Sequence, residues 1–181
     1  MEALGMLELN SIAGGIFAAD VMLKAANVSI RMSQPICPGK YAVIIYGAVA
    51  DVKAAIEAGV KESGTFVIDS IVIPHIHGSV LPALGGCVEL EGVDALGVIE
   101  TFSVAQALLS ADSAVKSADV TLMDIRLAAG LGGKAFVLIT GSVSAVREAV
   151  ASATSGREDG DMICNAVVIP APHKGLTALV Q

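Results

Sequence analysis

The chain contains two copies of one sequence pattern, and this internal repeat limits its fold more than any other feature. The segment Ala-Leu-Gly-Met-Leu-Glu-Leu at residues 3–9 returns as Ala-Leu-Gly-Val-Ile-Glu-Thr at residues 95–101. The offset between the copies is 92 residues here and reaches 96 at the two Val-Ile-Pro segments, 72–74 and 168–170. Insertions in surface turns account for the drift, because loops accept added residues more readily than packed elements do. A repeat of this length predicts two similar domains, since solenoid repeats are only about 20–50 residues long.

The repeat divides the 181 residues into two domains of about 90 residues each. We assign residues 1–86 to the first domain, residues 87–92 to a linker and residues 93–181 to the second domain. Apolar residues make up 54% of the chain, but aromatic residues only 3% and Trp is absent. Cores built from such small aliphatic side chains bury little area per residue, so we expect the domains to complete their burial by association.

Charge and composition exclude several classes of protein. The net charge is −7 and the sequence has no basic run, which argues against a nucleic-acid partner. The N-terminus lacks the basic region of a signal peptide. The longest segment without Asp, Glu, Lys or Arg, residues 70–88, contains two prolines and two histidines and is therefore not expected to span a membrane. We expect a soluble cytosolic protein whose three cysteines are reduced thiols.

Hydrophobic periodicity predicts six elements in each copy, in the order β-α-β-β-α-β. In the first copy the strands are expected at 3–9, 28–32, 41–46 and 65–73, and the helices at 12–26 and 49–63. Ile12, Ile16, Ala19, Leu23 and Ala26 give the first helix one apolar face, and Val52, Ala55, Ile56, Gly59 and Val60 point inward from the second. The prolines at 35 and 38 predict a loop over 33–39.

The second copy repeats this order and fixes the fold class. Its strands are expected at 95–101, 120–127, 134–140 and 162–169, and its helices at 103–117 and 143–155. The arrangement is α/β of the α+β kind, with two tandem ferredoxin-like domains.

Several motifs recur in both copies and resemble those of bacterial microcompartment shell proteins, in the tandem-domain, unpermuted class. They include Leu-Gly-x-x-Glu at residues 4–8, Ala-Asp-Val-Met-Leu-Lys-Ala-Ala at 19–26, the Gly-Lys pair at 39–40 and a Pro-His after the last strand. The resemblance covers almost the whole chain. It implies a homotrimer that mimics a hexamer and packs edge to edge with other shell proteins, in a microcompartment shell in the cytoplasm. It implies no enzymatic activity, and neither a Ser-His-Asp triad nor a carboxylate pair is evident in the sequence.

The resemblance also implies a contact between neighbouring tiles at Lys24 and Lys116. Each lysine follows an aspartate by four residues on a predicted helix, Asp20 and Asp112 respectively. The alternative is an ordinary surface ion pair, which stabilises a helix by only a few tenths of a kcal/mol.

In single-domain members of the family, the loop before the third strand lines a pore on the symmetry axis. The resemblance therefore implies a pore lined by Ile36, Cys37 and Pro38 from the first copy and by Gly130, Leu131 and Gly132 from the second. In a trimer, one Cys37 per chain would bring three thiols to one axis. Three converging thiolates favour a soft metal or a cluster.

The segment Ile-Cys-Pro-Gly-Lys at residues 36–40 resembles the cluster-bearing tandem shell proteins of propanediol-utilisation compartments. This resemblance implies one [4Fe–4S] cluster per trimer, bound by Cys37, with a luminal or cytosolic redox enzyme as a possible partner for electron transfer across the shell or for cluster delivery. The alternatives are an inert Cys37 in a plain shell tile with a metabolite pore, or a ligand-sensing regulatory protein with the same fold.

The remaining cysteines and histidines lack the spacing of a metal site. Cys164 is expected to be a buried apolar thiol, and Cys87 a structural or incidental one. His75 and His77 suit a zinc site on one strand face, but His77 recurs as His173 whereas His75 has no counterpart. The sequence therefore favours a packing role for the two histidines.

Overall fold

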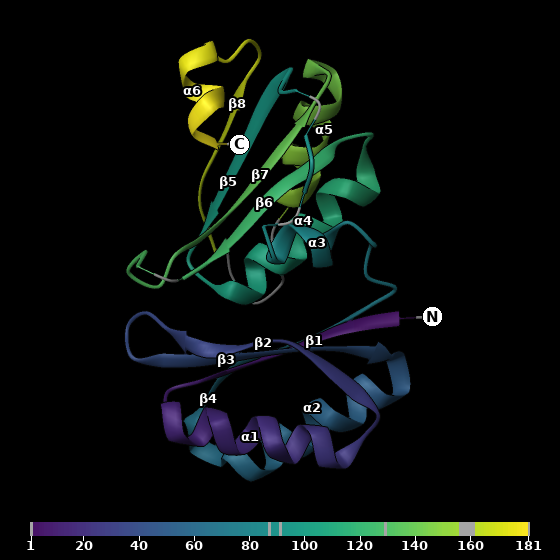
Figure 1. The fold of residues 1–181 in the computed structure, drawn as a ribbon, viewed down its shortest axis with the longest axis vertical. Coiled ribbons are helices and arrows are strands. Elements are labelled where there is room, and N and C mark those ends of the chain that lie inside the picture. Colours follow the sequence, from purple (N-terminus) through teal and green to yellow (C-terminus); the bar gives the residue numbers. More distant parts are fainter. Residues whose placement is uncertain (1, 87, 91, 129, 156–161, 181) are drawn as a thin grey trace. The chain divides into compact units, whose positions relative to one another are not determined.

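The computed structural model describes residues 2–86, 88–90, 92–128, 130–155 and 162–180, and it consists of two compact units (Figure 1). The first unit comprises Met1–Ile76 together with Ala129–Gly133, and the second comprises His77–Ala128 and Lys134–Gln181. Each unit contains one copy of the repeat with a four-stranded sheet, which confirms the predicted pair of domains.

The first unit has the predicted β-α-β-β-α-β order. Its elements are β1 (Glu2–Leu9), α1 (Ile12–Ala25), β2 (Val28–Ile36), β3 (Lys40–Ala48), α2 (Val49–Ser63), a short 3-10 helix η1 (Gly64–Phe66) and β4 (Val67–Pro74). The strands pair antiparallel in the order β2-β3-β1-β4. Helices α1 and α2 lie side by side on one face of this sheet (Figure 1).

The second unit repeats this arrangement and adds two short helices. Its elements are α3 (Val80–Leu84), β5 (Ala95–Thr101), α4 (Val104–Ser117), β6 (Thr121–Leu127), β7 (Ala135–Gly141), α5 (Val143–Ala153), β8 (Ile163–Ile169) and α6 (Lys174–Val180). The strands pair antiparallel in the order β6-β7-β5-β8. Neither α3 nor α6 was predicted. We assigned residues 77–86 to the first domain, but the structure groups them with the second unit because α3 packs against β6 and α4.

The core of the first unit lies between the sheet and its two helices. Leu7 and Leu9 from β1 and Val43 and Ile45 from β3 alternate toward the helices, as the period of two in a strand requires. From α2, the predicted residues Val52, Ala55, Ile56 and Gly59 are buried against them, and Val60 packs at the margin.

Helix α1 uses a different face from the one expected. Its buried residues are Gly15, Ala18, Ala19 and Met22. The side chains of Ile12, Ile16 and Leu23 are instead 43%, 57% and 44% exposed. Of the predicted face, only Ala19 is buried in the helix, and Ala26, just after it, packs partly buried against the core. Helix α1 packs into the core through three small residues and Met22, and it leaves the aliphatic side chains of Ile12, Ile16 and Leu23 exposed.

Strand β2 is longer than predicted. It continues to Ile36, and Pro35 pairs with Tyr41 of β3. Proline has no backbone N–H to donate, which disfavours it inside a sheet. However, β2 is an edge strand, and one side of an edge strand needs no ladder hydrogen bonds. The expected loop over 33–39 is therefore only the three residues Cys37, Pro38 and Gly39.

Candidate functional site

Cys37 lies at the tip of the β2–β3 hairpin. Ile36 and Lys40 form the last strand pair, and Cys37, Pro38 and Gly39 connect them. Ile36 is only 4% exposed and anchors the hairpin, whereas Pro38 and Gly39 are exposed and Cys37 is half-buried. Gly39 has φ of 72°, a conformation that favours glycine over other residues. The sequence thus builds a tight turn that holds one free thiol at its end.

The glycine-rich loop of the second copy lies against this turn, within the first compact unit. Gly130, Gly132 and Gly133 all have positive φ. A Cβ atom on Gly133 would lie 3.4 Å from the backbone oxygen of Cys37 and 3.4 Å from Cδ of Pro38. The structure therefore brings together the two loops that the sequence analysis assigned to a pore. Leu131, between the glycines, is exposed.

In the described part of one chain, the donor atoms do not complete a metal site. Among the described residues, no three His, Cys, Asp or Glu side chains gather closely enough to hold a metal ion. An iron–sulfur cluster is held by several cysteine thiolates, and one chain offers a single thiol at this turn. The turn therefore fits a shared cluster to which each of several copies contributes one Cys37, and the described residues of one chain do not complete such a site. Cys87 lies outside the described residues.

The two lysines predicted at tile edges occupy different environments. Lys24 pairs with Asp20, and their side chains are 74% and 52% exposed. Lys116 pairs with Asp112, whose side chain is almost completely buried. Asp112 also accepts a hydrogen bond of 2.8 Å from the backbone N–H of His77. Lys116 is therefore held in place more firmly than Lys24.

The two histidines differ in their surroundings. His75 is exposed and has φ of 54°, an uncommon conformation for a residue other than glycine. The ring nitrogen Nδ1 of His77 lies 2.8 Å from the hydroxyl of Ser79. This contact and the backbone bond to Asp112 give His77 a local structural role.

A polar cluster on the second sheet was missed by the sequence analysis. The ammonium group of Lys134 lies 3.1 Å from the carboxylate of Glu100, and both side chains are partly exposed. A hydrogen bond from Lys134, with a further one involving Cys164, lowers the pKa of Glu100 below its ordinary value. The pKa of Lys134 is raised, mainly by its hydrogen bond to Glu100 and further by one involving Cys164.

The first copy has the equivalent ion pair, Lys40 with Glu8, in a more buried environment. Lys40 lies 2.8 Å from Glu8, and the Glu8 side chain is only 4% exposed. The recurrence of the Glu and the Lys at matched positions was the sequence signal for both pairs. Cys164 occupies the bulge in β8 where the strand register shifts, and it is half-buried beside polar groups. The expectation of a buried apolar thiol was therefore wrong.

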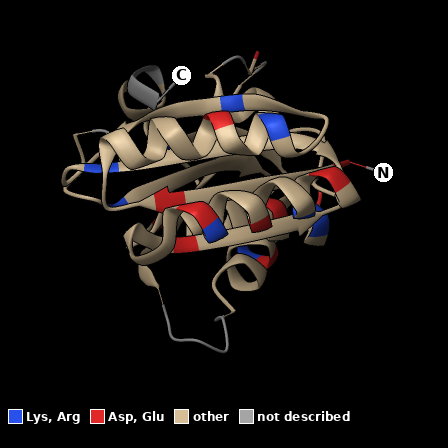
Figure 2. Cartoon of the chain, turned by 90° about the horizontal axis from the view of Figure 1, so that it is seen from below, with Lys and Arg blue, Asp and Glu red and all other residues tan. Residues whose placement is uncertain are grey.

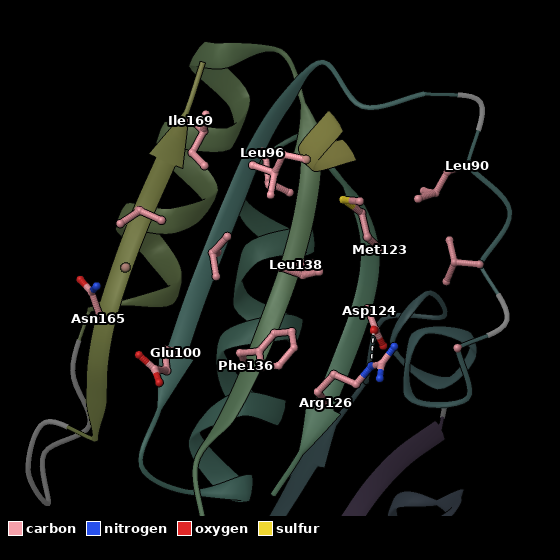
Figure 3. Close-up of a pocket in the computed structure, with 16 residues that line it drawn as sticks. Leu90, Leu96, Glu100, Met123, Asp124, Arg126, Phe136, Leu138, Asn165 and Ile169 are labelled. Carbon is pink, nitrogen blue, oxygen red and sulfur yellow. Dashed lines mark hydrogen bonds and ion pairs between the residues drawn. The ribbon is translucent and has the colours of Figure 1, made fainter. Parts of the chain in front are cut away.

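A hollow of about 630 Å³ opens on the second sheet (Figure 3). Its floor is apolar and is made by strand residues such as Leu96, Phe136 and Leu138. Leu90, from the segment that joins the two copies, lies along one side, and the ion pair of Asp124 with Arg126 lies near its end (Figure 3). Every lining residue belongs to the second unit.

Two further observations concern charge and membranes. Basic and acidic positions are interspersed on the view in Figure 2, and no run of neighbouring Lys and Arg is drawn among the described residues. None of the helices in the described part of the chain has the length and apolar character needed to cross a bilayer.

Comparison with known proteins identifies the family. The family model described as BMC domain matches twice, at residues 3–76 and 95–172. The chain is 42% identical to the bacterial microcompartment shell protein PduT of Citrobacter freundii, over 97% of this chain and 95% of that protein. It is 30% identical to the carboxysome assembly protein CcmO of Synechococcus elongatus, over 94% of this chain and 65% of that protein.

The fold agrees with a solved structure of the same kind. The crystal structure of a microcompartment protein from Desulfitobacterium hafniense superimposes with a TM-score of 0.93 and 44% sequence identity, covering 98% of this chain and 99% of that one. The two matches of the BMC-domain model fall on the two copies of the repeat, one on each. The chain therefore belongs to the BMC-domain family and carries two BMC domains in tandem.

Proposed function

We propose that this protein is a structural tile of a bacterial microcompartment shell, in the cytoplasm, and that it assembles as a homotrimer with a [4Fe–4S] cluster on its three-fold axis. The shell role is supported by the near full-length similarity to a protein named as a microcompartment shell protein. The trimer follows from two domains per chain, because three such chains give six similar wedges around an axis.

The observation that carries the cluster proposal is the presentation of Cys37. The thiol lies at the tip of a tight hairpin turn, partly exposed, beside a glycine-rich loop with little side-chain bulk. Three such turns at one axis would bring three thiolates together and leave the fourth iron to water or another ligand. When bound, such a cluster supplies one-electron transfer, which suits exchange with a redox enzyme on either side of the shell.

Anaerobic reconstitution with iron and sulfide tests the cluster. The wild-type protein should turn brown, absorb broadly near about 400 nm and approach one four-iron cluster per trimer. Cys37→Ser should abolish the colour and leave the trimer intact, because the turn lies outside the core. Cys87→Ser and Cys164→Ser are the matched controls and should keep the colour. Colour that survives Cys37→Ser would refute the assignment.

Assembly between tiles is tested separately. Replacing both Lys24 and Lys116 by Ala should leave trimers folded. The exposed pair of Lys24 contributes only about 0–1 kcal/mol to stability. The buried carboxylate of Asp112 keeps its hydrogen bond from the His77 N–H when Lys116 is removed. The double variant should form fewer sheets and co-assemble less with other shell proteins. Sheets that form as in the wild type would remove these lysines from the edge contact.

The runner-up is a plain shell tile whose central pore conducts metabolites. The glycine-rich loop beside Cys37 favours it, because small residues leave space for passage. A trimer that never takes up iron under any reconstitution condition would support this alternative. A soluble oligomer that never joins sheets would instead favour a ligand-sensing role.

A further inference from the structure

The turn that carries Cys37 is held at both ends by residues of the first copy. Ile36 precedes the turn and is only 4% exposed, and Lys40 follows it. The ammonium group of Lys40 lies 2.8 Å from the carboxylate of Glu8, whose side chain is almost fully buried. These contacts fix the base of the turn, and the tip with the thiol lies between them.

At its tip, the turn lies against a residue of the second copy. A Cβ atom on Gly133 would lie 3.4 Å from the backbone oxygen of Cys37 and 3.4 Å from Cδ of Pro38. Both distances are van der Waals contacts, so there is space for a methyl group but not, on that side, for a larger side chain. Gly133 also has φ of 91°, which disfavours any side chain. A glycine at this position therefore lets the loop approach the turn closely.

The internal repeat provides a comparison for this glycine. Gly39 is the equivalent residue in the first copy, and each of the two glycines directly precedes a lysine. Gly39 has a positive φ as well, of 72°, but a Cβ atom on it would meet no described atom within 4 Å. The backbone conformation alone accounts for Gly39, whereas Gly133 is explained by its conformation and by the neighbouring turn.

The loop that carries Gly133 has a defined base of its own. The backbone N–H of Ala128 donates a hydrogen bond of 3.1 Å to the carbonyl oxygen of Lys134 and closes the loop. The ammonium group of Lys134 lies 3.1 Å from Glu100 and 5.7 Å from the centre of the Phe102 ring. Because Gly133 directly precedes Lys134, groups of the second copy determine where it lies.

We propose that Gly133 is a positioning residue for the thiol of Cys37. By lying against the backbone of Cys37 and the ring of Pro38, it fixes the turn and with it the direction of the bond that carries the sulfur. Residues that orient a metal ligand in this way affect metal binding without touching the metal. This inference rests on the proposed cluster, and it adds the second copy to a site whose ligand comes from the first.

Iron titration of matched glycine variants tests the inference. Gly133→Val places γ carbons against the turn and should raise the iron concentration for half-maximal cluster absorbance by about tenfold, as for other residues that orient metal ligands. Gly133→Ala adds only a methyl group and should have a smaller effect. Gly64→Val and Gly64→Ala are the controls, because Gly64 has φ of 52° and an added Cβ there would meet no atom of the described residues within 4 Å. Both controls should take up iron as the wild type does.

A measurement without iron separates a misplaced thiol from a damaged protein. In a background of Cys87→Ser with Cys164→Ser, a short bifunctional maleimide should join Cys37 thiols of neighbouring chains in the trimer. Gly133→Val should lower the yield of joined chains on a denaturing gel, while native mass spectrometry still finds trimers and circular dichroism is unchanged. A residue that contributed only to stability would leave this yield unchanged in folded protein.

The outcomes separate this inference from the proposed function. If Gly133→Val binds the cluster as tightly as the wild type does, the positioning role is wrong and the cluster stands. Equal losses in the Gly64 and Gly133 variants would also overturn the role, because backbone strain would then be the cause. If the wild type takes up no iron but Gly133→Val still lowers the crosslinking, the cluster fails and the positioning of the thiol stands. Should the valine variant not fold, the two alanine variants decide in the same way.

Discussion

The two copies share one fold but fill the same place in it with different pairs of side chains. In the first copy, Gly15 of α1 faces the ring of Tyr41 on β3, and a Cβ on Gly15 would lie 2.3 Å from that ring. The equivalent residues in the second copy are Ala107 and Ala135, and both are fully buried. In the first copy, the large ring of Tyr41 leaves room only for a glycine at position 15. In the second copy, the small Ala135 leaves room for the methyl group of Ala107.

The same exchange occurs between the helices. A Cβ on Gly59 of α2 would lie 2.8 Å from Met22 of α1, and the equivalent residues in the second copy are Ala153 and Ala114. The glycine again accompanies the large partner. Interiors are close-packed, so a change in volume on one element must be matched on its neighbour. The comparison teaches that the duplicated cores have diverged in pairs and not residue by residue.

The largest expected difference between the copies concerns their ion pairs. Lys40→Met removes the partner of the buried carboxylate of Glu8 and should destabilise the first unit by about 3 kcal/mol. Urea unfolding followed by tyrosine fluorescence measures this, because the chain has no Trp and both tyrosines, Tyr41 and Tyr46, lie in the first unit. The protein concentration must be held fixed, since association also stabilises the fold.

Lys134→Met is the matched control in the second copy. Lys134 and Glu100 are 42% and 36% exposed, so water compensates for the lost partner. Hydrogen exchange should show little change in the second unit. Equal losses in the two units would contradict the distinction between a closed pair and an open one.

The next effect concerns the exchanged core pair. Gly15→Ala pushes a methyl group into the Tyr41 ring and should destabilise the first unit by about 2 kcal/mol, as overpacking does. Adding Tyr41→Ala recreates the pair found in the second copy, so the double variant should lose less than the sum of the two single changes. Tyr46 remains as the fluorescent probe. Strict additivity would show that the two positions are independent.

A smaller effect is expected at the aspartates beside the edge lysines. Asp112→Ala removes the acceptor of the His77 N–H and the partner of Lys116, and it should destabilise the second unit by about 1–2 kcal/mol. Asp20→Ala removes only an exposed pair and should cost at most about 0.5 kcal/mol. Thermal unfolding with hydrogen exchange in each unit checks both values. A larger loss at Asp20 would reverse the ranking.

The smallest effect is the pH dependence of the open pair. Because the pKa of Glu100 is lowered in the folded state, its contribution is full above the ordinary carboxyl value of 4.5 and is lost as the pH falls through the lowered value. The raised pKa of Lys134 makes its contribution full below 10.5 and lost at higher pH. Glu100→Gln should therefore be slightly less stable than the wild type near pH 7, and the difference should shrink toward pH 3. A difference that is constant with pH would exclude the ion pair as its cause.

The sequence predicted the order of elements and the sheet class, because apolar periodicity and the repeat both depend on local residues. It failed where the environment decides. Ile12, Ile16 and Leu23 have helical spacing, but spacing alone does not tell which of two apolar sides a helix turns toward its own sheet. Pro35 looked like a strand breaker, but an edge strand accepts it.

The site was predictable only in part, for a similar reason. The motif at residues 36–40 pointed to the turn that presents Cys37, and the two loops assigned to the pore do lie together. The bulge that places Cys164 beside Glu100 and Lys134 had no sequence signal, because a bulge depends on the pairing of two distant strands. Helix α3 could not be predicted from the sequence, because its five residues are too few to show a helical periodicity.

The loop that contains Gly130–Gly133 links the two repeats, because it is grouped with the structural unit of the other repeat. This loop belongs to the second repeat by sequence but to the first unit by structure, so the chain passes between units three times, at 76–77, 128–129 and 133–134. A cut after Ile76 would separate the rest of the first unit from Gly133, which lies against the backbone of Cys37. The boundary between the two structural units therefore does not coincide with the boundary between the two sequence repeats.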